Sequence, residues 1–253
     1  MNDLFTLKGK VAVVTGAAQG IGREIAIGFS RYGAEIAGVD LNEEKLQEVK
    51  KVIESQNGRC LALKVDLASV EETRRMTETV VREMGRIDIL ANIAGVNVHK
   101  PAEDMTEEDW DFVQDNNLRS LFFCCQCVGK VMLKQGSGRI INMSSSFGMV
   151  GFAGRTAYAS SKAGVTNLTK TLALEWSAKG INVNAIAPGP VWTPARDQLF
   201  SNPEFYNNLM TKLPIKRTAK PAEIVGPAVF LASEASSFVT GETLLVDGGW
   251  CAQ

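Results

Sequence analysis

The sequence has little of several features that mark other classes of protein. It holds one histidine, His99, and its formal net charge is only −1. Acidic and basic residues are spread evenly, so no basic face of the kind that binds nucleic acid is expected. The uninterrupted apolar runs are far shorter than the roughly 20 residues of a membrane-spanning helix. We therefore expect no nucleic-acid partner and no membrane partner.

Other absences bear on the compartment and on metals. Residues 1–8 lack a basic stretch followed by a long apolar core, so we expect no secretory signal and a soluble, cytoplasmic protein. Five cysteines, an odd number, do not suggest a disulfide framework. Cys124 and Cys127 form a C-x-x-C, but they lie in an apolar run that indicates a buried helix, and no second such pair exists. The expectation is no metal and small buried thiols; a redox or metal role is the alternative.

What the sequence does contain is a regular alternation of β-rich runs and stretches with helical spacing. Several runs are almost entirely apolar, as in parallel strands that are covered on both faces. The expected strands are 11–14, 35–39, 60–65, 87–90, 139–142, 181–186 and 243–246. The pattern predicts an α/β fold, a single Rossmann-type doubly wound parallel sheet of about seven strands with helices on both faces.

Helical stretches and their start signals lie between these runs. Residues 42–56 and 69–84 have helical spacing, and Ser69 and Thr106 each precede an acid by three positions, as helix caps do. No repeat or interdomain linker interrupts the order, so we expect one dinucleotide-binding and catalytic domain over residues 1–253. Residues 188–221, rich in Pro, Asn and Thr, are expected to be a long irregular insertion that acts as a mobile lid. A passive surface excursion is the alternative.

The first expected strand runs into a glycine-rich turn over residues 15–22, followed by a helix. Glycines there let backbone N–H groups approach a pyrophosphate, and the helix N-terminus adds partial positive charge. The G-x-x-x-G-x-G spacing departs from the G-x-G-x-x-G fingerprint, but its place after the first strand favours a dinucleotide site.

Asp40 ends the second expected strand, and its position indicates the choice of cofactor. A carboxylate there accepts hydrogen bonds from a ribose diol and repels a 2′-phosphate. Its neighbours Leu41 and Asn42 are uncharged, so NAD(H) is expected in preference to NADP(H); a solvated surface acid is the alternative. Residues 66–67 and 92–95 follow the next two strands, at the edge where open α/β sheets bind ligands.

Three separated segments carry polar residues suited to proton transfer at a carbon–oxygen bond. Tyr158 and Lys162 lie four apart on an expected helix and therefore share one face. A lysine charge favours phenolate, so such a tyrosine can take or return an alcohol proton. A serine in residues 144–146 can hold the same oxygen, and Asn117 lies in the helix that begins near Thr106. An exposed helical Tyr–Lys pair is the alternative.

These segments together resemble the short-chain dehydrogenase/reductase family. The resemblance covers essentially the whole chain and rests on residues 15–22, 66–67, 92–95, 188–189 and 247–249, with Asn117, Ser145, Tyr158 and Lys162. It implies that these last four form a catalytic tetrad, with Ser145 chosen because the family's serine lies 13 positions before its tyrosine. Lys162 would also hold the nicotinamide ribose, and Asn117 would order a water beside it. Ile93 departs from the pattern, since members often carry a second Asn there.

The motifs and the resemblance together give a set of expected cofactor contacts. The resemblance implies that residues 188–193 hold the carboxamide of the nicotinamide. The set is Gly16, Gln19, Gly20, Ile21, Gly22, Asp40, Leu41, Asp66, Leu67, Asn92, Ala94, Gly95, Tyr158, Lys162, Pro188, Gly189, Val191 and Thr193. The residues expected to contact substrate are Ser145, Phe147, Arg155 and Trp192.

The expected activity is NAD(H)-dependent interconversion of a secondary alcohol and a ketone, with Tyr158 as general acid and base. The chain is similar to members acting on sugars and sugar acids, such as gluconate 5-dehydrogenase or 2-deoxygluconate dehydrogenases. Two alternatives are a 3-oxoacyl carrier-protein reductase and a catalytically silent NAD(H)-binding sensor or scaffold. A hydrolase is disfavoured, since no G-x-S-x-G elbow occurs. The resemblance further implies a homotetramer, or a homodimer, with 121–132, 165–174 and Trp250 as candidate contacts.

Overall fold

The computed structural model describes residues 3–252, so residues 1, 2 and 253 of the expected domain lie outside it. Its centre is a seven-stranded sheet in the order β3-β2-β1-β4-β5-β6-β7, with every neighbouring pair parallel. The strands are β1 (Val11–Thr15), β2 (Glu35–Asp40), β3 (Cys60–Lys64), β4 (Ile89–Asn92), β5 (Gly138–Met143), β6 (Ile181–Pro188) and β7 (Thr243–Val246). The predicted fold class is confirmed.

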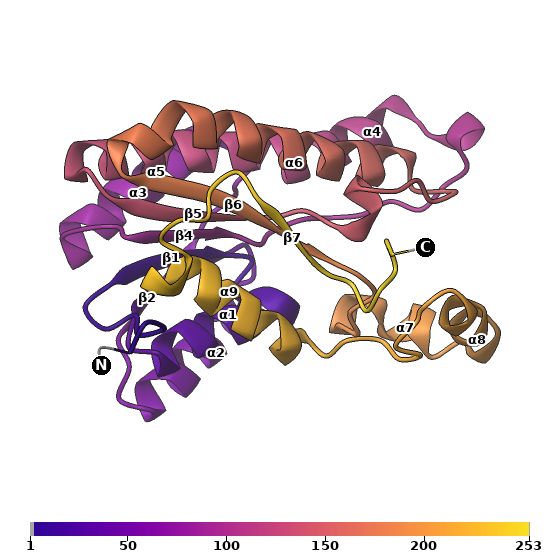
Figure 1. The fold of residues 1–253 in the computed structure, drawn as a ribbon, viewed down its shortest axis with the longest axis horizontal. Helices are drawn as coiled ribbons and strands as arrows, with labels where there is room; N and C mark the ends of the chain where they lie inside the picture. The colour runs from indigo at the N-terminus through magenta and orange to yellow at the C-terminus, as the bar shows by residue number, and fades with distance from the viewer. Residues whose placement is uncertain (1–2, 253) are drawn as a thin grey trace.

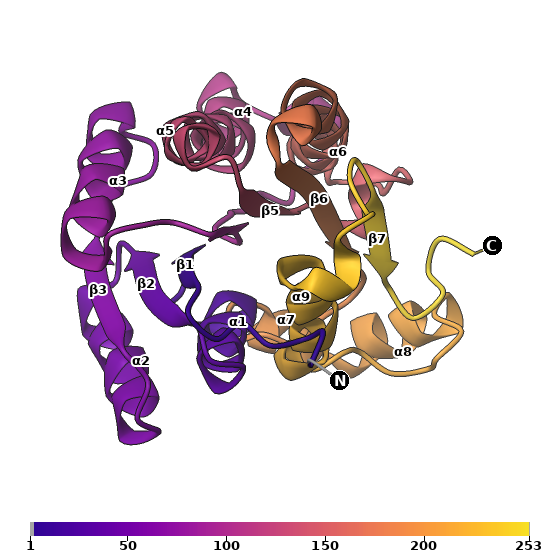
Figure 2. The same ribbon diagram turned by 60° about the vertical axis from the view of Figure 1, so that its left-hand side comes forward.

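Helices cover both faces of this sheet (Figures 1 and 2). One face carries α1 (Gly20–Arg31), α2 (Glu43–Ser55) and α9 (Val225–Ala232). The other carries α3 (Val70–Met84), α4 (Glu107–Gln114), α5 (Ser120–Gln135) and α6 (Thr156–Trp176). Two buried apolar clusters correspond to these two faces, which is why the strands are apolar on both sides.

The predicted element boundaries agree closely where a cap residue defines them. The Ser69 hydroxyl accepts from Glu72 N at 3.2 Å at the start of α3, and Thr106 forms a full capping box with Asp109 at the start of α4. The fourth strand was predicted two residues early, because the apolar run includes Ile87. The strand begins only at Ile89, because the carboxylate of the preceding Asp88 accepts a hydrogen bond from Val11 N at 2.9 Å.

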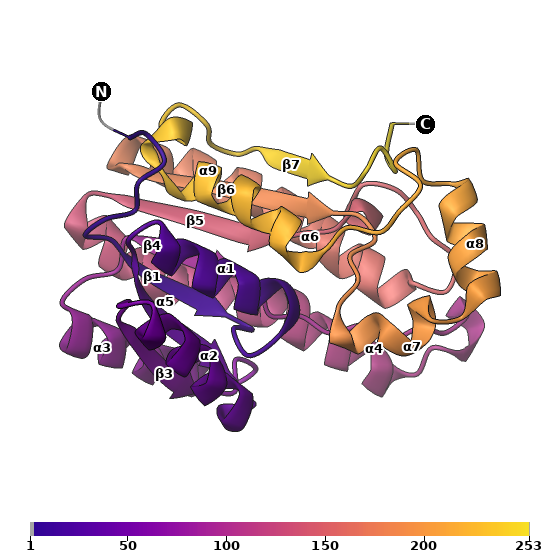
Figure 3. The ribbon, with the colours of Figure 1, turned by 90° about the horizontal axis from the view of Figure 1, so that it is seen from below.

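The sheet order reverses between β1 and β4, so the crevice at the carboxyl ends of these strands is the place where such folds bind ligands. Figure 3 shows α7 (Asp197–Phe200) and α8 (Pro203–Thr211) at this end of the sheet. The expectation of an irregular 188–221 insertion was therefore wrong in part. Asn202 caps α8 by accepting from Glu204 N and Phe205 N, and its apolar face packs with Trp250.

This packing buries the Trp250 side chain within its own chain. Little of its surface is therefore left to contact a second copy. Within residues 3–252 no helix combines the length and the apolar character needed to cross a membrane.

Candidate active site

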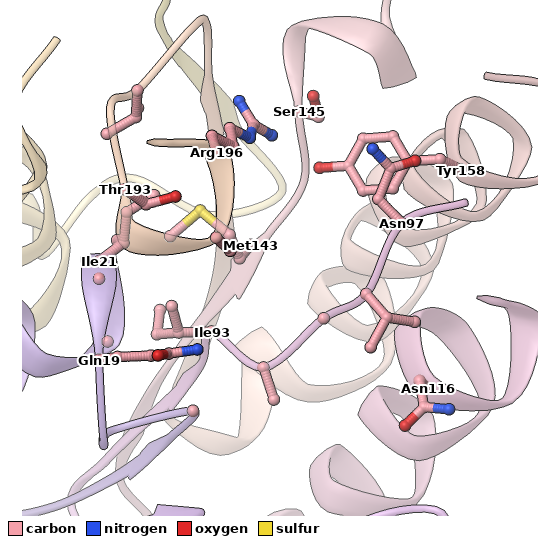
Figure 4. Close-up of a pocket in the computed structure, with 18 of the residues that line it drawn as sticks. Gln19, Ile21, Ile93, Asn97, Asn116, Met143, Ser145, Tyr158, Thr193 and Arg196 are labelled. Atoms are coloured by element: carbon pink, nitrogen blue, oxygen red, sulfur yellow. The ribbon is translucent and has the colours of Figure 1, made fainter. Parts of the chain in front are cut away.

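A cavity of about 830 Å³ opens at the carboxyl ends of the strands, between the glycine turn, the loop after β4 and the segment before α7 (Figure 4). Nearly all of the predicted cofactor contacts line it, together with Ser145, Arg155, Tyr158 and Lys162. Residues that the sequence analysis did not single out also line it, among them Val65, Asn97, Asn116, Met143 and Arg196.

The turn between β1 and α1 depends on glycine. Gly16 and Gly20 have φ of +66° and +56°, a region that L side chains rarely adopt. A Cβ on Gly22 would lie 2.1 Å from Gly16 O, which is impossible without moving the backbone. The N-cap residue Gln19 makes no side-chain cap bond, so N–H groups of the first turn of α1 are left for another acceptor. This turn fits the pyrophosphate of a dinucleotide.

Asp40 is held in place by two backbone donors. Its Oδ2 accepts from Ala18 N at 3.0 Å and its Oδ1 from Asn42 N at 2.9 Å. The carboxylate thus joins the glycine turn to the end of β2 and still faces the cavity, where each oxygen has capacity for a further hydrogen bond. Lys45 is the basic group nearest along α2, and its ammonium donates to Gln19 Oε1 at 3.2 Å.

Asn92 does not reach the cavity, contrary to the sequence expectation. Its amide donates to Asn142 Oδ1 at 3.0 Å and to Cys125 Sγ at 3.2 Å, beneath the strand ends. The period of two along β4 turns it away, and the next residues, Ile93, Ala94 and Gly95, line the cavity instead. Thr15 fixes this loop by accepting from Ile93 N at 2.9 Å.

Tyr158 and Lys162 lie together on α6 and both are buried. The ammonium is 5.7 Å from the centroid of the phenol ring and donates to Met143 O at 2.8 Å. Burial alone raises the pKa of Tyr158, but the charges of Lys162 and Arg196, a hydrogen bond from Ser145 and the charge of Arg155 outweigh it. The pKa of the phenol therefore lies below its ordinary value.

The three serines after β5 have different surroundings. Ser145 lines the cavity with Tyr158 and is near enough to lower the pKa of that phenol, and its Oγ accepts from Phe147 N at 3.2 Å. Ser144 also lines the cavity, but its Oγ donates to Lys162 O at 3.0 Å and is 2.9 Å from Thr166 Oγ1. Of these hydroxyls, Ser145 is thus the one that can share a substrate oxygen with Tyr158.

Asn117 stands in a π-helical turn, Asp115–Arg119, which separates α4 from α5. The sequence predicted one continuous helix from Thr106, since the spacing does not reveal the extra residue; such widened turns occur often at functional sites. The Asn117 amide accepts from Val96 N at 2.7 Å and donates to Val96 O and to Ser161 Oγ. A Cβ on Gly95 would lie 3.0 Å from Asn117 Oδ1 and 3.3 Å from Lys162 Nζ, so the two groups flank that glycine.

The predicted substrate contacts Phe147, Arg155 and Trp192 do not all line the main cavity. Arg155 is buried and lines the main cavity as well as a side pocket of about 40 Å³. Phe147 lines the side pocket and stacks on Phe152 with 4.6 Å between ring centroids. Trp192 lines neither, because its Nε1 donates to Asp197 at 3.0 Å and its ring packs on α7 and α8.

Arg196 was missed by the sequence analysis. It ends a 3-10 turn, Pro194–Arg196, and lines both the cavity and the side pocket. Figure 4 shows its guanidinium on the same side of the cavity as Ser145 and the Tyr158 hydroxyl. Nothing in the spacing of residues 188–221 distinguishes this arginine, because the turn that aims it depends on the packing of α7 and α8.

All five cysteines are unpaired, and residues 3–252 contain no cluster of three His, Cys, Asp or Glu side chains that could hold a metal. Burial raises the pKa of Cys124 to about 12 and that of Cys125 further, so these thiols are inert at neutral pH.

Comparisons with known proteins agree with this geometry. Residues 16–251 match the family model described as enoyl-(acyl carrier protein) reductase. The chain is 38% identical to 2-dehydro-3-deoxy-D-gluconate 5-dehydrogenase of Dickeya dadantii over 252 residues, which cover 99% of each protein. It is 41% identical to D-threitol dehydrogenase of Mycolicibacterium smegmatis, over 97% of this chain and 94% of the relative.

A solved structure shows the same fold. Gluconate 5-dehydrogenase of Burkholderia cenocepacia, in complex with NADP and tartrate, superposes with a TM-score of 0.96. The two chains are 33% identical, and the match covers 99% of this chain and 98% of the other.

Proposed function

The chain belongs to the short-chain dehydrogenase/reductase family of oxidoreductases that act on CH–OH groups, and we propose that Tyr158 is its general acid and base. The observation that carries this proposal is the position of Tyr158, a buried phenol that faces the cavity with the Lys162 ammonium 5.7 Å from its ring centroid. Lys162 and the neighbouring positive charges lower the pKa of this phenol, despite its burial. A lowered pKa increases the fraction of phenolate near neutral pH; the phenolate takes the proton of an alcohol, and the resulting phenol returns it when a ketone is reduced.

The neighbouring groups support this proton transfer. When bound, a nicotinamide cofactor accepts the hydride from the alcohol carbon or delivers it to the ketone. Ser145 donates to the substrate oxygen as negative charge develops there, and Lys162 stabilises the phenolate. Asn117 holds the 95–97 loop beside Lys162 through its bonds to Val96, so we assign it a positioning role.

The cofactor is proposed to lie along the remaining residues of the cavity. The glycine turn takes the pyrophosphate, Asp40 the adenosine ribose, and Asp66 and Leu67 the adenine. The loop 93–95 and the segment 188–193 take the nicotinamide end. We propose NAD(H) in preference to NADP(H), because the fixed Asp40 carboxylate would repel a 2′-phosphate.

Residues 188–221 are proposed to form a lid within a single domain. The segment carries Thr193 and Arg196 into the cavity, and α7 and α8 follow directly. A bridge between Val191 and Ala219 joins its two ends, so α7 and α8 form a hinged unit between them.

A sugar, sugar acid or polyol is the proposed substrate class. The names of the two relatives above cover a sugar acid and a polyol, and the many polar groups around Ser145 and Asn97 suit a polyhydroxylated compound.

We also propose a cytoplasmic homotetramer, with a homodimer as the alternative. Unpaired thiols suit a reducing compartment. The outer faces of α5 and α6 form a groove with Leu118, Phe122 and Leu168 that a second copy could cover. Light scattering would give the mass of the assembly.

The test is an absorbance assay at 340 nm with NAD⁺ or NADP⁺ and a panel of polyols, sugar acids, secondary alcohols and hydroxysteroids. NAD-linked turnover of a polyhydroxylated compound is expected. Tight NADH binding with no turnover of any panel member would instead support the silent sensor or scaffold.

A further inference from the structure

Two arginines from separate elements face the same end of the cavity. Arg155 immediately precedes α6, and Arg196 immediately precedes α7. Both line the main cavity and the side pocket, and Ser145 lies in both linings as well. Burial lowers the pKa of Arg155, and the neighbouring charge of Arg196 lowers it further.

Neither guanidinium has a counter-charge in residues 3–252. Other arginines do, such as Arg86 with Asp88 at 2.6 Å and Arg217 with Glu223 at 2.7 Å. Arg155 is only 8% exposed, and its Nε is buried without a hydrogen-bond partner. A buried charge without a partner is costly, and a second positive charge beside it adds repulsion.

An anion placed between the two arginines would offset both costs. The guanidinium fork donates two parallel hydrogen bonds to a carboxylate, which makes arginine the residue suited to carboxylate recognition. Burial strengthens such bonds, since little water competes for the donors. Tyr158, Lys162 and His99 are the titratable groups that line the same end of the cavity as the two arginines. His99, whose pKa is lowered by burial and by Arg155, and Lys162 carry no negative charge, and Tyr158 is an uncharged phenol when it is ready to protonate a ketone.

The position of the pair separates it from the cofactor's phosphates. The side pocket is bordered by Phe147, Phe152 and Leu199, and by no residue of the glycine turn or of β2. With a volume of about 40 Å³, it has room for a group of carboxylate size next to Ser145, which also lines the main cavity together with Tyr158. The anion must therefore belong to the molecule whose oxygen Tyr158 protonates.

We propose that Arg155 and Arg196 bind the carboxylate of the substrate, which makes the substrate a hydroxy acid and its keto acid rather than a neutral polyol. This inference rests on the proposed function, because it takes Ser145 and Tyr158 as the reacting end of the cavity. It selects one of the compound classes that the proposed function leaves open.

The test measures binding rather than turnover. The protein, saturated with NADH, is titrated by calorimetry with two matched pairs: D-gluconate against D-glucitol, and L-tartrate against L-threitol. In the first pair one carboxylate is replaced by a neutral hydroxymethyl group, and in the second pair both carboxylates are replaced. We expect at least one acid to bind the wild type roughly ten times more tightly than its polyol, with that preference lost in Arg155→Gln and in Arg196→Gln.

Controls keep the outcomes distinct. Arg59→Gln removes a surface arginine that pairs with Glu35, and it should leave both Kd values unchanged. NADH affinity and the melting temperature of each variant show whether the fold and cofactor site survive. Arg155→Lys keeps the charge but loses the fork, so it should restore the acid preference only in part.

Three results would overturn the inference: equal binding of acid and polyol by the wild type, an acid preference that survives both substitutions, or a loss of NADH affinity in place of acid affinity. The last would assign the arginines to the cofactor's pyrophosphate. A wild type that fails to bind NADH would contradict the proposed function itself.

Discussion

Tyr158 is buried, and a buried phenol ordinarily keeps its proton more tightly than one in water. The pKa of Tyr158 is nevertheless lowered, because the charges of Lys162, Arg196 and Arg155 and the hydroxyl of Ser145 favour the phenolate. Only Lys162 of these cations could be expected from the sequence, through its place four residues later on the same helix face. Arg155 was expected as a substrate contact, and Arg196 not at all, since its direction depends on the turn before α7.

Arg196→Gln is predicted to change the pH profile of alcohol oxidation. The Arg196 charge lowers the pKa of Tyr158, so its removal raises that pKa. Oxidation requires the phenolate, and the rise of kcat/KM with pH should therefore move to higher pH. The measurement is kcat/KM against pH for wild type, Arg196→Gln and the surface control Arg59→Gln. An unmoved or acid-shifted profile in Arg196→Gln would show that this charge does not act on Tyr158.

Asp40→Ala is predicted to narrow the preference for NAD⁺ over NADP⁺ by roughly 10- to 100-fold. The substitution removes the hydrogen bonds from the ribose diol of NAD⁺ to the carboxylate, and it removes the charge that repels the 2′-phosphate of NADP⁺. The ratio of kcat/KM values for the two cofactors measures the effect. Glu44→Gln removes one nearby negative charge from the start of α2 and serves as the matched control. The ribose assignment fails if both variants keep the wild-type ratio.

At the scale of the elements, the strands and caps were largely predictable. Alternating apolar runs located all seven strands, and Ser69 and Thr106 marked helix starts that the structure confirms. Features that depend on packing were not predictable from local pattern. The π-turn around Asn117 needs only one extra residue in a helix, and α7 and α8 are stabilised mainly by an apolar cluster with Trp250. The prediction that Asn92 lines the cavity was wrong, because a motif at the end of a strand does not show toward which face of the sheet its last side chain points.

Gly22→Ala is predicted to destabilise the turn between β1 and α1. The new Cβ would lie 2.1 Å from Gly16 O, and relief requires the backbone to move, at a cost of about 1–3 kcal/mol. NADH binding should weaken together with the melting temperature. Gly226→Ala in α9 is the control, because a Cβ there meets nothing within 4 Å and a helical alanine adds up to about 1 kcal/mol. Equal behaviour of the two variants would mean that the tight turn is not needed.

At the scale of the whole molecule, the proposed lid, residues 188–221, shares one apolar cluster with Phe147 and Phe152, which follow Ser145 in the chain. Trp250 contacts the rings of Phe147 and Phe152, with centroids 5.9 and 6.0 Å away, and the same cluster includes Leu209 and Leu213. Residues that follow β5, residues of α8 and residues that follow β7 therefore support one another. Short-range sequence patterns do not register this kind of contact, because its partners lie about a hundred positions apart.

Trp250→Ala is predicted to loosen this end of the molecule. Loss of a buried tryptophan costs about 3–5 kcal/mol in a packed core, and here the lost contacts are those with the apolar residues of α7 and α8. Proteolysis within residues 197–215 should become faster under native conditions, and the Michaelis constant should rise. Tyr32→Ala removes an exposed aromatic ring at the end of α1 and should change neither. Unchanged proteolysis in Trp250→Ala would separate the lid from this cluster.

The role of Tyr158 is the central claim, and Tyr158→Phe tests it most directly. The substitution keeps the ring in its packing and removes only the hydroxyl. Turnover of the best substrate should fall by about 10²- to 10⁴-fold, while NADH affinity, measured by fluorescence titration, stays at the wild-type value. Turnover near the wild-type rate would contradict the account, because it would mean that the proton is carried by a group other than Tyr158.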